Sequence, residues 1–280
     1  MQTLAEPIFM NTKLGLFCDK VIEVGWLAAL VVTPLLFNVY SEDPFAVHKV
    51  SMVRSIALVM ALAWIVRTLE SQPDREMPLV QRLRRFISTP LVLPGLAFAA
   101  VHLLTTATSV WRHGSLWGSY DRRQGTYATL SYVTIFLLIL HSLRTKDQLE
   151  RLVRLTVLAS LPVAAYAIAQ RYANLPGPWA GRSSARASSS LGNPIFSAAY
   201  LMMVIPLTLR GVLRSLSRSR EPGRDRRTPY LMSAAIYLVV LLAQLTGIIL
   251  SQSRGPFLGL LVGLFLFGLL WTRSTHRRKL

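Results

Sequence analysis

The chain alternates between long apolar runs and short polar segments that are rich in arginine. A helix that crosses a bilayer needs about 20 mainly apolar residues. Eight stretches are expected to form such helices, at approximately residues 21–39, 47–66, 90–110, 126–143, 153–169, 194–209, 230–250 and 256–272. Their apolar residues lack the alternation of strands, and inside a bilayer only helices and closed barrels satisfy the backbone. The pattern therefore predicts an all-α, polytopic membrane protein whose residues 1–280 form a single membrane domain.

The composition agrees with a membrane location. Hydrophobic residues make up 52% of the chain, charged residues 16%, and the mean hydropathy is +0.42. An average soluble domain carries about 25% charged residues. Cys18 is the single cysteine, which excludes an intrachain disulfide and a cysteine-based metal site.

Basic residues are distributed unevenly between the two sides that the spans would define. With a cytoplasmic N-terminus, the inner segments hold 22 Lys and Arg residues and the outer segments hold 8. Since cytoplasmic loops carry the excess of Lys and Arg, this bias predicts that both termini are cytoplasmic. Inner runs such as 218–227 are sufficiently explained as topology anchors beside anionic membrane lipid. The net charge of +18 arises from these short runs rather than from one soluble face, so we expect no nucleic-acid partner.

Arginines on the outer side run against this bias and need another explanation. Arg122 and Arg123 precede the fourth predicted helix, Arg182 and Arg186 precede the sixth, and Arg254 stands between the seventh and the eighth. Guanidinium groups bind phosphate bidentately, and helix N-termini add donors and a positive dipole. The three turns together predict a binding site for a phosphate or pyrophosphate group at the outer membrane surface. For any single arginine, contact with lipid headgroups is the alternative.

The second of these turns leads into a helix with a well-defined start. Pro194 fits the first turn of a helix, and the preceding Asn193 can cap its exposed N–H groups. Gly192 allows a tight backbone turn just before the helix, so that unpaired N–H groups there could face an anion. An ordinary capped helix start is the alternative interpretation.

Arg54 and a row of three glycines are notable features within the predicted spans. Arg54 lies about two turns below the outer end of its helix, where a charge is costly and usually faces a partner or a cavity. We therefore expect Arg54 to face the same anion-binding cavity. Gly255, Gly259 and Gly263 have the spacing that lets two helices approach closely, which predicts a packing role.

Three motifs, in this order, carry a resemblance to a known family. They are Gly118-Ser-Tyr-Asp-Arg-Arg-Gln-Gly125, then Arg186 through Leu191-Gly-Asn-Pro194, and then Ser253-Arg-Gly255. With these motifs the chain resembles the O-antigen ligase and O-antigen polymerase family over roughly residues 90 to 270. The Gly-Asn-Pro segment before an apolar helix is the most specific part of the match.

The resemblance implies a metal-independent, inverting glycosyltransferase without cofactors in the bacterial cytoplasmic membrane. Such enzymes take a glycan from an undecaprenyl diphosphate carrier and pass it to an acceptor, while outer arginines hold the pyrophosphate. Carried over by motif, Arg186 and Arg254 are the leading candidates, followed by Arg122 and Arg123. Preorganised cations of this kind stabilise the charge that builds up on a departing pyrophosphate.

The chain departs from the family pattern in one respect. Family members usually continue for several more helices and carry a large outer loop with a histidine that is thought to activate the acceptor, whereas this chain ends after eight predicted helices. No residue here inherits that role, so no catalytic residue is assigned, and we expect a chain truncated relative to the family. Two alternatives remain open: a non-catalytic protein that binds or flips lipid-linked oligosaccharide, and a structural subunit of a larger membrane complex with protein partners.

Overall fold

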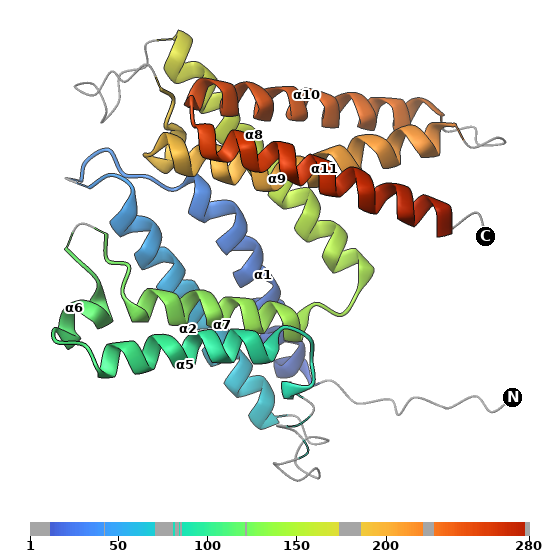
Figure 1. Ribbon diagram of the computed structural model, residues 1–280. Coiled ribbons are helices and arrows are strands. Elements are labelled where there is room, and N and C mark those ends of the chain that lie inside the picture. Colours follow the sequence, from blue (N-terminus) through green and yellow to red (C-terminus); the bar gives the residue numbers. More distant parts are fainter. Residues whose placement is uncertain are drawn as a thin grey trace, which may run out of the picture. The chain divides into compact units, whose positions relative to one another are not determined.

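The computed structural model describes residues 12–41, 43–70, 81, 84, 86–120, 122–173, 186–220 and 227–277. Within these residues every regular element is a helix, which confirms the all-α prediction (Figure 1). The elements are α1 (Lys13–Leu35), α2 (Ala46–Glu70), α5 (Val92–Ala107), α6 (Arg112–Trp117), α7 (Thr126–Ser142), α8 (Lys146–Tyr172), the 3-10 turn η1 (Ser189–Leu191), α9 (Pro194–Ser219), α10 (Arg227–Ser251) and α11 (Arg254–Arg277).

Five of these helices, α2, α8, α9, α10 and α11, are long and apolar enough to cross a membrane, while α5 and α7 are shorter apolar helices. Many large apolar side chains on the helices are exposed, including Phe265 and Leu270 on α11. Exposed apolar surface of this extent is unusual for a soluble monomer. The described helices are therefore consistent with a multi-pass membrane protein.

Helix ends differ from the predicted span ends because hydropathy does not report capping. Helix α1 begins at Lys13 rather than near residue 21, and the hydroxyl of Thr12 accepts a hydrogen bond from the N–H of Gly15 at 3.1 Å. Helix α9 continues to Ser219 through arginine-bearing turns. Arginine is a good helix former, so a helix can outlast its apolar part.

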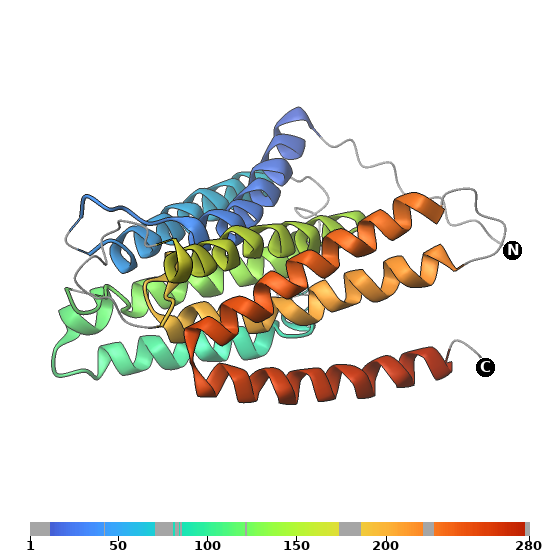
Figure 2. The same cartoon turned by 90° about the horizontal axis from the view of Figure 1, so that it is seen from above.

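By its internal contacts the chain divides into two compact units. Unit 1 comprises Met1–Ala29 and Val50–Lys146, and unit 2 comprises Leu30–Lys49 and Asp147–Leu280. In unit 1, α7 packs against α5 and α6. In unit 2, α9 packs along α10 and against α11, as both views show (Figures 1 and 2).

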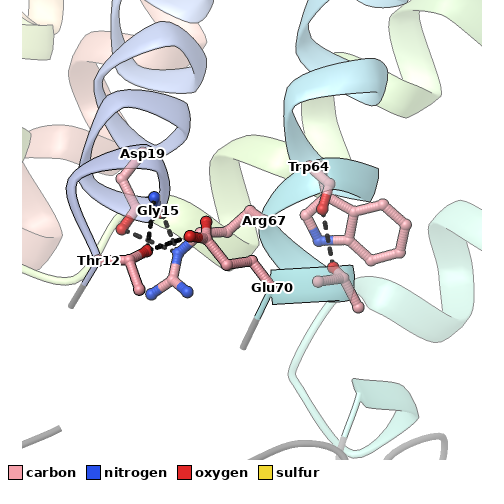
Figure 3. A network of polar contacts seen from close by, with 7 residues as sticks. Thr12, Gly15, Asp19, Trp64, Arg67 and Glu70 are labelled. Carbon is pink, nitrogen blue, oxygen red and sulfur yellow. Dashed lines mark hydrogen bonds and ion pairs between the residues drawn. The ribbon is translucent and has the colours of Figure 1, made fainter. Parts of the chain in front are cut away.

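In unit 1, helices α1 and α2 are joined by packing and by an ion pair. Met60 lies against Gly25 so closely that an added Cβ would be 2.4 Å from its side chain. Farther along, Arg67 Nε donates to both carboxylate oxygens of Asp19 at 3.2 Å, and the Thr12 hydroxyl donates to Glu70 (Figure 3). Segments around residues 20 and 67 were both predicted to lie on the inner side, and here they lie together.

The core of unit 2 is built around α9. Buried residues of α8, α9, α10 and α11 form one cluster, which includes Val163, Ala198, Leu201, Ile248 and Leu260. Gln244, which is fully buried, joins three of these helices because its Nε2 donates to Ser160 Oγ at 2.7 Å and to Thr208 Oγ1 at 3.0 Å. An apolar core thus surrounds one buried polar connection.

The predicted glycine packing row on α11 is wrong at two of its three positions. An added Cβ at Gly259 would lie 2.7 Å from the sulfur of Met202, so a side chain of α9 packs against this glycine. At Gly255 and Gly263, the described part of the chain has no atom within 4 Å of the Cβ position. The four-residue spacing places these glycines near one face of α11, but α9 covers only part of that face.

Candidate anion-binding site

The turn between α10 and α11 is held by Arg186. Its Nε donates to the carbonyl oxygen of Ser251 at 3.0 Å, and its Nη2 donates to Ser253 Oγ at 3.0 Å. Next to it, the N–H of Ala187 donates to the carbonyl of Leu250 at 3.0 Å. Two of the three predicted arginine turns are therefore in direct contact. Two nitrogens of the Arg186 guanidinium donate to this turn, so Arg186 supports the turn that carries Arg254.

Buried hydrogen bonds fix the segment that follows Arg186. Ser189 lies in the left-handed region at φ 53°, its N–H donates to Gln170 Oε1 at 2.7 Å, and its hydroxyl donates to the carbonyl of Val163 at 2.6 Å. Lys49 Nζ donates to the carbonyl oxygens of Ser190 at 2.8 Å and of Pro34 at 3.3 Å. These hydrogen bonds tie the backbone of residues 189 and 190 to neighbouring parts of unit 2.

The sequence assigned no role to Gln170, and Lys49 was one of the eight Lys and Arg residues of the predicted outer segments. Both side chains position the 189–190 backbone. Lys49 and its acceptor Ser190 are 141 residues apart in the sequence. No local pattern signals such a pair. The one local feature that set Lys49 apart in the sequence was its position at the start of an apolar run.

The predicted helix start at α9 is confirmed. Gly192 has φ +74°, and its Cα faces the ring of Phe45, which an added Cβ would approach to 2.4 Å. Asn193 Oδ1 accepts from the N–H of Ile195 at 2.8 Å, and Pro194 is the first residue of the helix. Because Asn193 occupies this N–H, the α9 start offers fewer free donors to an anion than the sequence suggested.

Arg254 lies at the rim of an open pocket. The pocket has a volume of about 440 Å³ and is lined by Ile248, Ile249, Gln252, Ser253, Arg254, Phe257 and Leu258. Arg254 is exposed and begins α11, where the first N–H groups of a helix have no partner within the helix. One cation and a helix N-terminus therefore border a largely apolar wall. An amphipathic anion, with a charged head and an apolar chain, suits this combination.

In unit 1, Arg54 lies beside the loop that carries Arg122 and Arg123. Its Nη2 donates to the carbonyl oxygens of Arg123 at 2.6 Å and of Trp117 at 3.3 Å. Its guanidinium carbon lies 4.7 Å from the ring centre of Tyr127 and 5.8 Å from that of Trp117. Arg122 and Arg123 are both exposed.

The predicted site residues thus fall into two groups, each within one unit. Arg186 holds the turn that carries Arg254 in unit 2, and Arg54 donates to the Arg123 carbonyl in unit 1. Arg182 lies outside the described residues. The expectation that all three turns share one cavity stays a prediction.

Among the described residues, no group of three or more His, Cys, Asp or Glu side chains is placed to hold a metal ion. Comparisons with protein-family models, with curated proteins and with solved structures find no match to this chain.

Proposed function

We propose that this protein binds the lipid-linked glycan carrier undecaprenyl diphosphate and transfers its glycan to an acceptor, in the manner of the O-antigen ligase and polymerase family. The reaction would take place at the outer face of the bacterial cytoplasmic membrane, with eight spans and both termini inside. The pocket beside Arg254 carries the proposal, since it combines an apolar wall with a cationic rim. A polyprenyl diphosphate has the matching division into apolar chain and anionic head.

Within this proposal, Arg254 contacts the diphosphate, and Arg186 holds the turn from which it projects. The acceptor hydroxyl attacks the anomeric carbon of the glycan, a new glycosidic C–O bond forms, and the C–O bond to the diphosphate breaks. The leaving diphosphate gains negative charge, which a preorganised guanidinium stabilises in the transition state. The hydroxyl proton passes to a base that we do not assign to a residue.

A non-catalytic role in binding or flipping the same carrier is the second candidate. It is favoured by the pocket itself, whose lining contains no histidine, aspartate or glutamate. A binding protein needs the cation and the apolar wall but no base. Both candidates therefore predict the same ligand and differ in whether turnover follows.

Replacement of Arg254 tests the shared part of the proposal. Arg254→Ala is expected to weaken binding of undecaprenyl diphosphate glycan in detergent by about 1.5 to 3 kcal/mol, the range for a hydrogen bond to a charged group. Arg273→Ala is the matched control, because Arg273 is also an exposed arginine on α11 but lies near its other end. Equal binding by the Arg254→Ala variant and the wild-type protein would refute the site.

Turnover separates the two candidates. Purified protein is mixed with glycan-labelled carrier and a lipid or polymer acceptor, and the label on the acceptor is followed over time. Transfer that is lost in the Arg254→Ala variant and kept in the Arg273→Ala variant supports the enzyme. Binding without transfer supports the non-catalytic role.

A further inference from the structure

The loop between α6 and α7 closes tightly on itself. An added Cβ at Gly118, which has φ +85°, would lie 2.5 Å from the backbone N of Gln124, and one at Gly125 would lie 2.4 Å from the carbonyl oxygen of Leu116. The N–H of Arg123 also donates to the carbonyl of Ser119 at 2.8 Å. The two ends of the loop therefore touch, and glycine is required at both points of contact.

Arg123 occupies an unfavourable backbone conformation in this loop. Its φ of 49° lies in the left-handed region, which non-glycine residues rarely adopt. Such a conformation persists when the surroundings hold it in place. A specific restraint on the Arg123 backbone is therefore expected.

Arg54 of α2 supplies this restraint. Its Nη2 donates to the carbonyl oxygen of Arg123 itself and to that of Trp117, so one guanidinium holds both ends of the loop. The rings of Tyr127 and Trp117 flank the same guanidinium. Guanidinium combines a planar face for aromatic rings with several fixed donors, and lysine does not.

We propose that Arg54 is a positioning residue, which holds the two ends of the α6–α7 loop together at Trp117 and Arg123 and leaves Arg122 and Arg123 exposed as the anion-contacting groups of unit 1. This assignment differs from the sequence expectation that Arg54 itself faces the ligand. That Arg123 contacts a diphosphate rests on the proposed function, whereas the restraint on the loop does not.

Trypsin cleavage in the absence of ligand tests the restraint. Trypsin cuts after Arg122 and Arg123 when the loop opens, and at equilibrium the cleavage rate follows the open population. In the Arg54→Lys variant, which keeps the charge but not the fork, cleavage in detergent is expected to be about tenfold faster than in the wild-type protein. Cleavage after Arg220 in unit 2 is expected to be unchanged and serves as the internal reference.

A pair of variants at Tyr127 provides a second measurement that does not alter Arg54. Tyr127→Leu removes the nearer ring from the guanidinium and is expected to raise the cleavage rate about threefold. Tyr127→Phe keeps the ring and is expected to leave the rate at the wild-type value. Equal rates in the Leu and Phe variants would contradict the role of the ring.

Binding of a diphosphate probe, undecaprenyl diphosphate in detergent, completes the test. If Arg54 acts through the loop, Arg54→Lys loses both loop protection and affinity. If the loop of Arg54→Lys is cleaved as slowly as that of the wild-type protein, the proposal is overturned. If this variant also loses affinity for the probe while its loop stays closed, Arg54 contacts the ligand directly. If the wild-type protein binds no probe but Arg54→Lys opens the loop, the restraint stands and the proposed function fails.

Discussion

At the residue scale, glycines mark places where two parts of the backbone or a ring come too close for a side chain. Gly192 was recognisable from the sequence because Asn193 and Pro194 follow it, and the observed φ of +74° agrees with that interpretation. The ring of Phe45 that covers Gly192 was not recognisable, since it lies far away in the sequence. The local conformation could thus be predicted, and its tertiary partner could not.

Substitution of Gly192 should therefore cost more than substitution of an open glycine. Gly192→Ala combines an unfavourable φ with a Cβ placed 2.4 Å from the Phe45 ring. We expect it to lower the free energy of unfolding by about 1–3 kcal/mol. Gly263→Ala is the control, because its Cβ would meet no described atom and alanine raises helix propensity by up to about 1 kcal/mol. Unfolding of both variants in mixed detergent provides the measurement, and equal losses would contradict the prediction.

At the scale of elements, the sequence predicted where the long helices are but not the short helix α6 or what fixes the helix ends. Each predicted span overlaps an observed helix, because about 20 consecutive apolar residues are a strong signal. Contacts at the candidate site were not predictable in the same way. Arg54 bonds to carbonyls 63 and 69 residues away, and backbone acceptors leave no mark in the sequence. The charge bias indicated which arginines were unusual. The structure divides them into arginines that hold a loop or turn, Arg54 and Arg186, and arginines that are exposed, Arg122, Arg123 and Arg254.

The buried hydrogen bonds of Gln244 allow a test of how α8, α9 and α10 are held together. In a double-mutant cycle with Gln244→Leu and Thr208→Val, we expect a coupling energy of about 0.6 kcal/mol and at most about 1.7 kcal/mol, the mean and the maximum for hydrogen bonds between membrane helices. Thr208 Oγ1 can accept this bond while it donates to the carbonyl of Val204 at 3.3 Å, because a hydroxyl both donates and accepts.

Thr246→Val is the control partner in this cycle. The Thr246 hydroxyl donates to Leu242 of its own helix at 2.9 Å, and no bond to Gln244 is among its contacts. Coupling between Gln244→Leu and Thr246→Val should therefore be close to zero. The measurement is the unfolding free energy of each variant in detergent. A Gln244–Thr208 coupling no larger than this control would show that the buried amide does not join the helices.

At the scale of the whole molecule, the contacts between helix ends agree with the charge bias within each unit. In unit 2, Glu150 pairs with Arg214 at 2.7 Å, and both belong to segments predicted to be inside. The Arg186 and Arg254 turns, both predicted to be outside, also meet each other. Helix ends that share a predicted side thus lie together, as a bundle of membrane-spanning helices requires. This pairing agrees with successive helices that run in alternating directions.

Labelling of single cysteines tests the orientation directly. In a Cys18→Ala background, Gln252→Cys at the α10–α11 turn and Gln124→Cys in the α6–α7 loop should react with a membrane-impermeant maleimide on intact cells. Ser217→Cys, near the end of α9, should react only after lysis. All three positions are exposed, so accessibility to the reagent depends on the side of the membrane.

Helix α10 has 25 residues, and at 1.5 Å per residue such a helix is about 37 Å long, enough to separate its two ends across a hydrocarbon core of about 30 Å. Labelling of Ser217→Cys but not Gln252→Cys on intact cells would reverse the orientation and place Arg254 in the cytoplasm. Reaction of both on intact cells would mean that α10 does not cross the membrane.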